Sequence, residues 1–146
     1  MERILKIKIP SLILDQIHTH GEESYPEEGA GLMLGKDDGE IRSVINLIAL
    51  KNAREENARH NRYLLTADDM LSAEKEADRL GLSILGIFHS HPDHPNQPSE
   101  FDREYAIPWY SYLITTIQEG KATSSKCWRL TDDRTGFDEE ELLIIE

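Results

Sequence analysis

Apolar and polar residues follow two successive periods along the first part of the chain. In the second half of residues 4–9 they alternate, which is the period of a half-buried strand. In residues 12–20 the apolar positions recur at helical spacing, with Ser11 at the position of an N-cap, until Tyr25-Pro26 interrupts the pattern. The sequence therefore predicts a strand and then a helix that packs on a sheet.

A hairpin is expected next. Residues 29–35 are apolar and rich in glycine, which favours a buried strand that other backbone approaches closely. Turn-forming residues at 37–39 and an apolar, β-branched stretch at 41–50 follow, so the second strand should pair with the first. The polar residues 51–61 contain three asparagines and indicate a surface loop.

A second helix is expected in the middle of the chain, after a short strand at residues 62–65. Thr66 and Asp69 have the spacing of a capping box at its amino end. The apolar stripe of this helix runs to Leu80, and Gly81 suits the first position beyond a helix end because glycine adopts left-handed backbone freely.

Further strands are expected in the second half of the chain. Residues 82–88 form a continuous apolar run, typical of a central strand buried on both faces. Residues 109–117 and 127–130 have strand composition, whereas 137–145 fits an edge strand or a helical turn equally well. With no repeat and no linker, these elements predict a single α+β domain over residues 1–146.

Composition narrows the class of protein. The chain has 146 residues, of which 38% are hydrophobic, enough for the core of one domain. Its 16 basic and 28 acidic residues give a formal net charge of −12, which argues against nucleic acid as a partner. No apolar run approaches the ~18 residues of a membrane helix. The single cysteine, Cys127, and an amino terminus unlike a signal peptide make the cytoplasm the expected location.

Two histidines follow the predicted central strand. His89 and His91 are two positions apart, so their imidazoles point the same way from an extended chain and can converge on one ion. Ser99 follows His91 after seven intervening residues, and Asp102 lies three positions further, one helical turn away. Two imidazoles and a carboxylate suit Zn²⁺ with a fourth position left for water, as in catalytic sites.

A hydrolytic zinc site also needs a base that is not a ligand. Glu27 and Glu28 stand directly before the glycine-rich strand and are the candidates. Each feature has a simpler explanation when taken alone: chance for the histidine pair, helix capping for Ser99 and Asp102, and a solvated surface position for Glu28. Their combination favours the metal site. The other histidines and two strand residues are expected to be exposed or to pack: His18, His20, His60, His94, Cys127 and Trp128.

The order of these residues resembles the JAMM signature of the MPN-domain (Mov34/MPN/PAD-1) metallopeptidases. The match begins at Glu28, which is followed by the Gly31-to-Gly35 strand, continues through His89-Ser90-His91-Pro92, and ends at Ser99 and Asp102. Glu27 is out of register by one position. The resemblance covers nearly the whole chain and implies a cytidine-deaminase-like fold, with a mixed β-sheet flanked by two or three helices.

The resemblance also implies roles for the individual residues. Zn²⁺ would be bound by His89, His91 and Asp102. Glu28 would act as general base and then general acid on the zinc-bound water. Ser99 would donate a hydrogen bond to the developing oxyanion. All ligand positions are filled, which favours an enzyme over the scaffold members of the family.

The implied activity is a zinc-dependent isopeptidase or peptidase that hydrolyses the amide bond after the C-terminal Gly-Gly of a ubiquitin-like or sulfur-carrier protein. One alternative is release of an amino acid such as cysteine from a sulfur-carrier tail, and another is a non-catalytic MPN scaffold. The short segment between Asp102 and Pro108 indicates a compact prokaryotic form. The identity of the carrier, the leaving group and the oligomeric state stay open.

Overall fold

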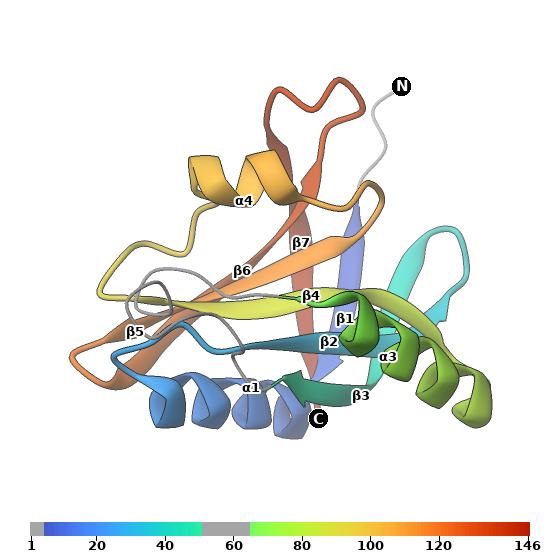
Figure 1. The fold of residues 1–146 in the computed structure, drawn as a ribbon, viewed down its shortest axis with the longest axis horizontal. Coiled ribbons are helices and arrows are strands. Elements are labelled where there is room, and N and C mark those ends of the chain that lie inside the picture. Colours follow the sequence, from blue (N-terminus) through green and yellow to red (C-terminus); the bar gives the residue numbers. More distant parts are fainter. Residues whose placement is uncertain (1–4, 51–64) are drawn as a thin grey trace.

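The computed structural model describes residues 5–50 and 65–146 (Figure 1). Two predicted elements lie outside these ranges: the loop at 51–61, which contains His60, and the strand at 62–65, of which only Leu65 is described. The described elements are, in chain order, β1 (Lys6–Pro10), α1 (Ser11–Ser24), β2 (Ala30–Asp37), β3 (Ile41–Leu50), α3 (Ala67–Leu80), β4 (Ser83–Pro92), α4 (Glu100–Tyr105), β5 (Ser111–Gln118), β6 (Lys121–Leu130) and β7 (Phe137–Ile145).

The strands form a closed barrel in the order β1-β3-β2-β4-β5-β6-β7, and β1 pairs with β7 to complete it. Pairing is parallel between β1 and β3, β1 and β7, and β4 and β5, and antiparallel elsewhere. The sheet is therefore mixed, as predicted. Helices α1 and α4 lie on opposite sides of the barrel (Figure 1). No helix in the described ranges is long and apolar enough to cross a membrane.

Strand β4 lies between β2 and β5 and is buried over most of its length. Its alternate side chains enter two different apolar clusters. Phe88 packs with Ile7, Met33 and others, whereas Ile87 packs in a second cluster with Tyr112. The prediction of a central strand buried on both faces is confirmed, and its last residues carry the two histidines into the interior.

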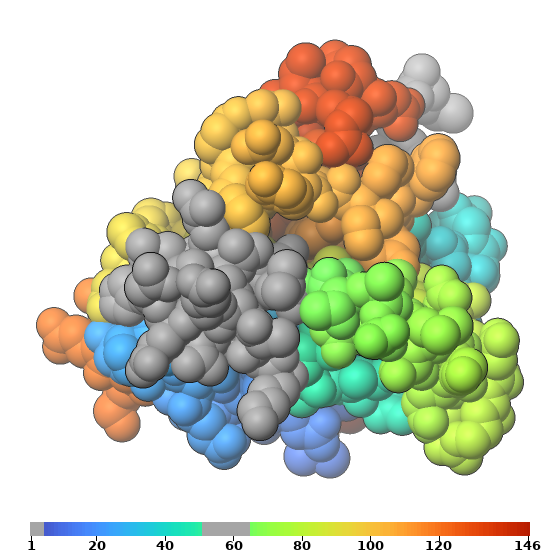
Figure 2. Space-filling model, viewed as in Figure 1, coloured from blue at the N-terminus to red at the C-terminus, as the bar shows by residue number. Residues whose placement is uncertain are grey.

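Helix α4 packs against the turn between β6 and β7, and the two segments lie side by side on the face drawn in Figure 2. Arg103 of α4 donates a hydrogen bond to the carbonyl oxygen of Arg134 at 3.0 Å. In return, the Arg134 guanidinium donates to the carbonyl oxygens of Glu104 at 3.4 Å and Ala106 at 3.3 Å. These bonds fix the helix that follows the proline-rich loop.

The hairpin of β2 and β3 and the second helix agree with the sequence predictions. Thr66 and Asp69 form both hydrogen bonds of the capping box, and Gly81 ends α3 in the left-handed conformation, with φ of 70°. The prediction that Ser11 is the N-cap of the first helix is wrong. Pro10 occupies that position without a side-chain cap, because β1 runs into α1 with no linker, so Ser11 is already helical.

Two strand starts and the assignment of residues 137–145 also differ from the predictions. β5 begins at Ser111, because Trp109 has left-handed backbone with φ of 68° and cannot continue an extended strand. β6 begins at Lys121, six positions before the predicted start. Its first half is polar and so gave no strand pattern in the sequence, but it pairs with β5. Residues 137–145 are a strand paired on both sides, not an edge strand or a helical turn.

A substitution at Gly86 tests how closely β4 and β5 approach each other. A methyl group there would overlap the backbone of Ser111, whereas one at Gly136 meets nothing within 4 Å. We expect Gly86→Ala to lower the free energy of unfolding by about 3 kcal/mol or more, because backbone cannot yield as a side chain does. Gly136→Ala should raise it by up to about 1 kcal/mol, because alanine restricts the unfolded chain more than glycine does. Urea unfolding of both variants measures the difference, and equal stabilities would refute the close approach.

Candidate metal centre

His89 and His91 lie at the carboxyl end of β4, where parallel pairing with β5 extends to Pro92. Their ring centroids are 5.0 Å apart, and their exposed fractions are 1% and 7%. The pleat of the strand sends both rings to the same side, as their spacing predicted. Both rings are therefore almost wholly buried at this end of β4.

Asp102 reaches the histidines from α4. Ser99 is the N-cap of this helix: its Oγ accepts a hydrogen bond from the Asp102 N–H at 3.1 Å, and the Asp102 carboxylate accepts one from the Ser99 N–H at 2.8 Å. The same carboxylate places Oδ1 3.4 Å from Nε2 of His89 and Oδ2 3.2 Å from Nε2 of His91. A tetrahedral zinc ion with bonds of roughly 2.1 Å has ligand separations of about 3.4 Å. Each of the two nitrogen–oxygen distances therefore matches the distance between two ligands of one zinc ion.

Glu28 approaches His89 from the other side. Its Oε1 lies 3.0 Å from Nδ1 of His89, and only 4% of the residue is exposed. Taken alone, Glu28 was expected to be a solvated carboxylate on the surface. That expectation is wrong, because the residue is buried. Two backbone contacts hold the segment: Ser90 N–H donates to the Gly29 carbonyl at 2.9 Å, and Gly29 N–H donates to Ser90 Oγ at 2.8 Å. Ser90, which sequence reasoning passed over, thus joins the start of β2 to the histidine strand.

The electrostatics of the cluster favour a positive charge at its centre. Burial disfavours the charged form of His89, but Asp102 and Glu28 on either side outweigh burial and raise the pKa of the imidazole. Burial likewise opposes the charged form of Asp102. The two histidines and the N–H of Ser99 outweigh it and hold the pKa of this carboxyl well below its usual range. A divalent cation would satisfy the same two carboxylates.

Among the described residues, Glu28, His89, His91 and Asp102 each offer a donor atom within 4.8 Å of the others, and all four are buried. Two imidazoles with carboxylate oxygens are a donor set that suits Zn²⁺. The structure thus brings together the predicted ligands and the predicted base. Ser99 lines the adjoining cavity of about 500 Å³, together with Glu28, His91, His94, Pro95 and Phe101.

The other histidines have different surroundings. His94 is exposed at the rim of the cavity, as expected, and is not part of the cluster. His18 Nε2 is 2.9 Å from Ser125 Oγ, and His20 Nε2 is 3.1 Å from the Ala30 carbonyl oxygen. Cys127 is fully buried, and burial raises the pKa of its thiol, as expected for a core residue.

The loop at residues 93–98 carries contacts that sequence reasoning missed. Its Pro95 carbonyl oxygen is 2.8 Å from Nδ1 of His91, which leaves Nε2 facing Asp102. Trp128, expected to be a core residue, is only partly buried, and its indole N–H donates to the Asn96 carbonyl at 3.0 Å. The buried Asn96 side chain donates to Ser124 Oγ at 2.8 Å. Strand β6 therefore holds the loop that orients His91.

Comparison with protein families matches residues 10–131 to the model described as prokaryotic homologs of the JAB domain. The chain is 35% identical over 110 residues to the probable TtuB-protein conjugate cleaving protease of Thermus thermophilus, which covers 75% of this chain and 70% of that protein. It is 30% identical over 115 residues to the desampylase of Haloferax volcanii, which covers 75% of this chain and 79% of that protein.

Solved structures show the same architecture. A protein of Desulfitobacterium hafniense, determined in solution, has a TM-score of 0.84 at 30% identity and covers 96% of this chain and 93% of its own. A JAB1/MPN domain protein of Archaeoglobus fulgidus has a TM-score of 0.60 at 22% identity, over 97% of this chain and 98% of its own. The predicted fold class, an α+β MPN domain with a mixed sheet, is confirmed.

Trp128→Phe tests the support of the loop. We expect it to weaken Zn²⁺ binding about three- to tenfold, because without the indole N–H the loop no longer holds Pro95 against His91 as firmly. Competition with a chromophoric chelator measures the affinity. Trp109→Phe, at an exposed tryptophan outside the loop, is the control and should bind Zn²⁺ like the wild type. Equal affinities for all three proteins would show that the tether does not orient the histidine.

Proposed function

The chain belongs to the family of prokaryotic JAB-domain homologues, and from this premise we propose that it is a zinc-dependent isopeptidase. Its substrate would be a ubiquitin-like or sulfur-carrier protein, cut at the amide bond after the C-terminal Gly-Gly. The observation that carries the proposal is the buried group of Glu28, His89, His91 and Asp102 beside an open cavity. A structural metal site has no need of an adjoining cavity that a substrate can enter.

His89, His91 and Asp102 would hold the metal. Zn²⁺, when bound, supplies Lewis acidity that polarises a carbonyl group and makes a water molecule more acidic. The protein must then hold the two imidazoles neutral and correctly turned. The Pro95 carbonyl oxygen, 2.8 Å from Nδ1, would do so for His91. The Glu28 carboxylate, whose Oε1 lies 3.0 Å from Nδ1, would do so for His89 through charge.

Glu28 would also move the proton. Its carboxylate both contacts His89 and lines the cavity, so it can face an attacking water while it stays fixed to the histidine strand. It would take a proton from that water and later give it to the departing amine, so that no proton is gained or lost over the cycle. A carboxylate in this position is the non-ligand base that amide hydrolysis requires.

Ser99 would stabilise the oxyanion. As N-cap it accepts a hydrogen bond from Asp102 through an oxygen lone pair, which leaves the hydroxyl hydrogen available for donation. Ser99 also lines the cavity. The capping role and the catalytic role therefore use different parts of the same hydroxyl group.

The substrate class rests on the relatives. One is named as a protease that cleaves TtuB–protein conjugates and another as a desampylase, and both names support a protein conjugate as substrate. An extended Gly-Gly tail would suit a narrow approach to the buried donors, because glycine allows the closest contact with the backbone of the site. Release of cysteine from a carrier tail would use the same residues and differ in the leaving group alone.

Glu28→Gln tests the proposed base. We expect at least a hundredfold loss of turnover with Zn²⁺ still bound, because the amide keeps the shape and the contact with His89 but cannot take a proton. The substrate is a Gly-Gly-ended ubiquitin-like protein from the same organism, carrying a lysine-linked or short C-terminal extension, and intact mass measures cleavage. A scaffold would cleave nothing in either form, and undiminished cleavage by the variant would exclude Glu28 as the base.

Ser99→Ala separates catalysis from capping. We expect a stability loss of about 1 kcal/mol together with a ten- to thousandfold loss of turnover, since both the cap and the oxyanion donor disappear. Thr66→Ala is a matched control, because Thr66 and Asp69 form the same capping box in α3 and belong neither to the cluster nor to the lining of its cavity. It should cost similar stability and leave turnover unchanged. Equal losses of turnover in the two variants would show that only stability is affected.

A further inference from the structure

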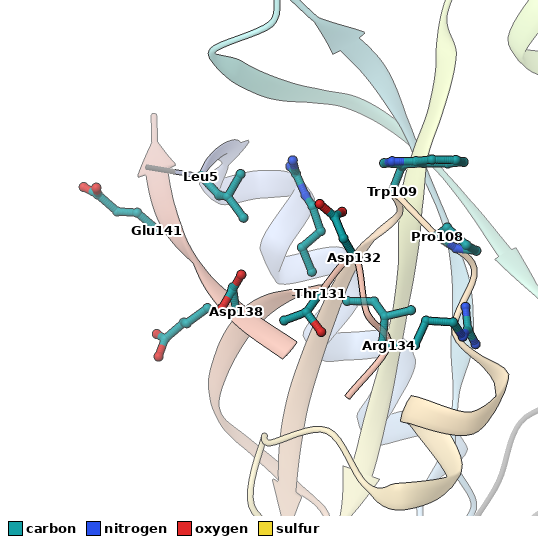
Figure 3. Close-up of a pocket in the computed structure, with 11 residues that line it drawn as sticks. Leu5, Pro108, Trp109, Thr131, Asp132, Arg134, Asp138 and Glu141 are labelled. Atoms are coloured by element: carbon teal, nitrogen blue, oxygen red, sulfur yellow. The ribbon is translucent and has the colours of Figure 1, made fainter. Parts of the chain in front are cut away.

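The described residues line a second cavity, of about 990 Å³, which is larger than the cavity of about 500 Å³ at the candidate metal centre. It lies where the Pro108-Trp109 segment, the turn after β6 and the first half of β7 come together. Figure 3 shows Trp109 and Pro108 on one side, Thr131 and Asp132 in the middle, and Asp138 and Glu141 of β7 on the far side. We call this cavity the Trp109 groove.

The register of β4 and β5 separates the groove from the metal centre. His91 pairs with Thr116, and Gly86 pairs with Ser111. These two rows are five residues apart, about 17 Å at the rise of a β-strand. Trp109 precedes Ser111, so it lies beyond the end of β5 that is remote from the histidines. The Trp109 groove is a separate site.

An exposed aromatic ring dominates one wall of the groove. Trp109 is 75% exposed, and Pro108 and Leu5 add apolar surface beside it. A single exposed apolar residue is common on protein surfaces, but a tryptophan in a concave site offers a flat face with negative quadrupole. Such a face attracts lysine and arginine side chains. Tryptophan is also enriched among the residues that dominate binding energy at interfaces.

The charges around the ring are mostly negative. Asp132, Asp138, Glu139 and Glu141 are exposed and line the groove. Of the two arginines in its wall, Arg129 is paired with the buried Glu140 at 2.6 Å. The guanidinium of Arg134 is directed to the backbone carbonyl oxygens of Glu104 and Ala106. Asp132 and Asp138 therefore present carboxylates on the side of the groove that faces Trp109, whereas Glu141 points away from the ring (Figure 3).

We propose that the Trp109 groove docks a lysine- or arginine-rich segment of a partner protein. The cation would stack on Trp109 while the carboxylates of Asp132 and Asp138 complete its pairing. Charge complementarity selects this occupant, because an acidic or phosphorylated segment would meet the carboxylates of Asp132 and Asp138. The proposal does not depend on the hydrolytic activity, and its test uses binding alone.

Binding of a fluorescein-labelled hexalysine peptide to the full chain, followed by fluorescence anisotropy at low salt, tests the groove. We expect saturable binding that weakens as salt is added. Trp109→Ala should weaken it about three- to fivefold, the effect of losing one cation–π contact, and Trp109→Phe should keep part of the affinity. Asp132→Asn with Asp138→Asn should weaken binding at least about threefold and reduce its salt dependence.

A charge-matched pair of substitutions distinguishes the groove from the overall charge of −12. Glu23→Gln with Glu119→Gln removes the same two charges from exposed positions, and Glu119 lies just beyond the opposite end of β5. This variant should bind hexalysine like the wild type. An equal loss of affinity in both double variants would show attraction by net charge alone, and undiminished binding by Trp109→Ala would overturn the proposal.

Discussion

A buried imidazole held between two carboxylates is the interaction on which the rest of the site depends. His89 contacts Glu28 through Nδ1 and Asp102 through Nε2, and all three residues are almost wholly excluded from water. Burying two carboxylates is costly unless a positive charge compensates them. The fold meets this cost with closely spaced histidines on a central strand, and the two carboxylates raise the pKa of His89 despite its burial.

The same capping motif has different consequences in two helices. Thr66 with Asp69 and Ser99 with Asp102 form identical pairs of hydrogen bonds. At α3 the carboxylate only completes a helix end, whereas at α4 it also reaches two histidines because the helix begins beside the end of β4. The motif therefore predicts the helix start, and only its distance from the histidines in the sequence points to the chemistry.

A feature could be predicted from the sequence where it depends on residues that are close together along the chain. The β2–β3 hairpin, α3 and the convergence of His89 with His91 depend on local spacing, and each was predicted. The polar half of β6 pairs with the neighbouring β5, but it lacks apolar alternation, so periodicity did not reveal it. The closure of the barrel depends on the pairing of β7 with β1, far along the chain. The bond from Trp128 to Asn96 is of the same kind, since its donor and acceptor are 32 positions apart.

The topology also explains why a metal centre and the Trp109 groove adjoin the same connection. Strands β4 and β5 are parallel neighbours, so the chain must return from the carboxyl end of one to the amino end of the other by a crossover. That crossover leaves beside His91, carries Asp102 in α4 and arrives at Trp109 just before β5. One short segment therefore supplies a residue to each site. The hydrogen bonds between α4 and the turn at Arg134 hold it in place between them.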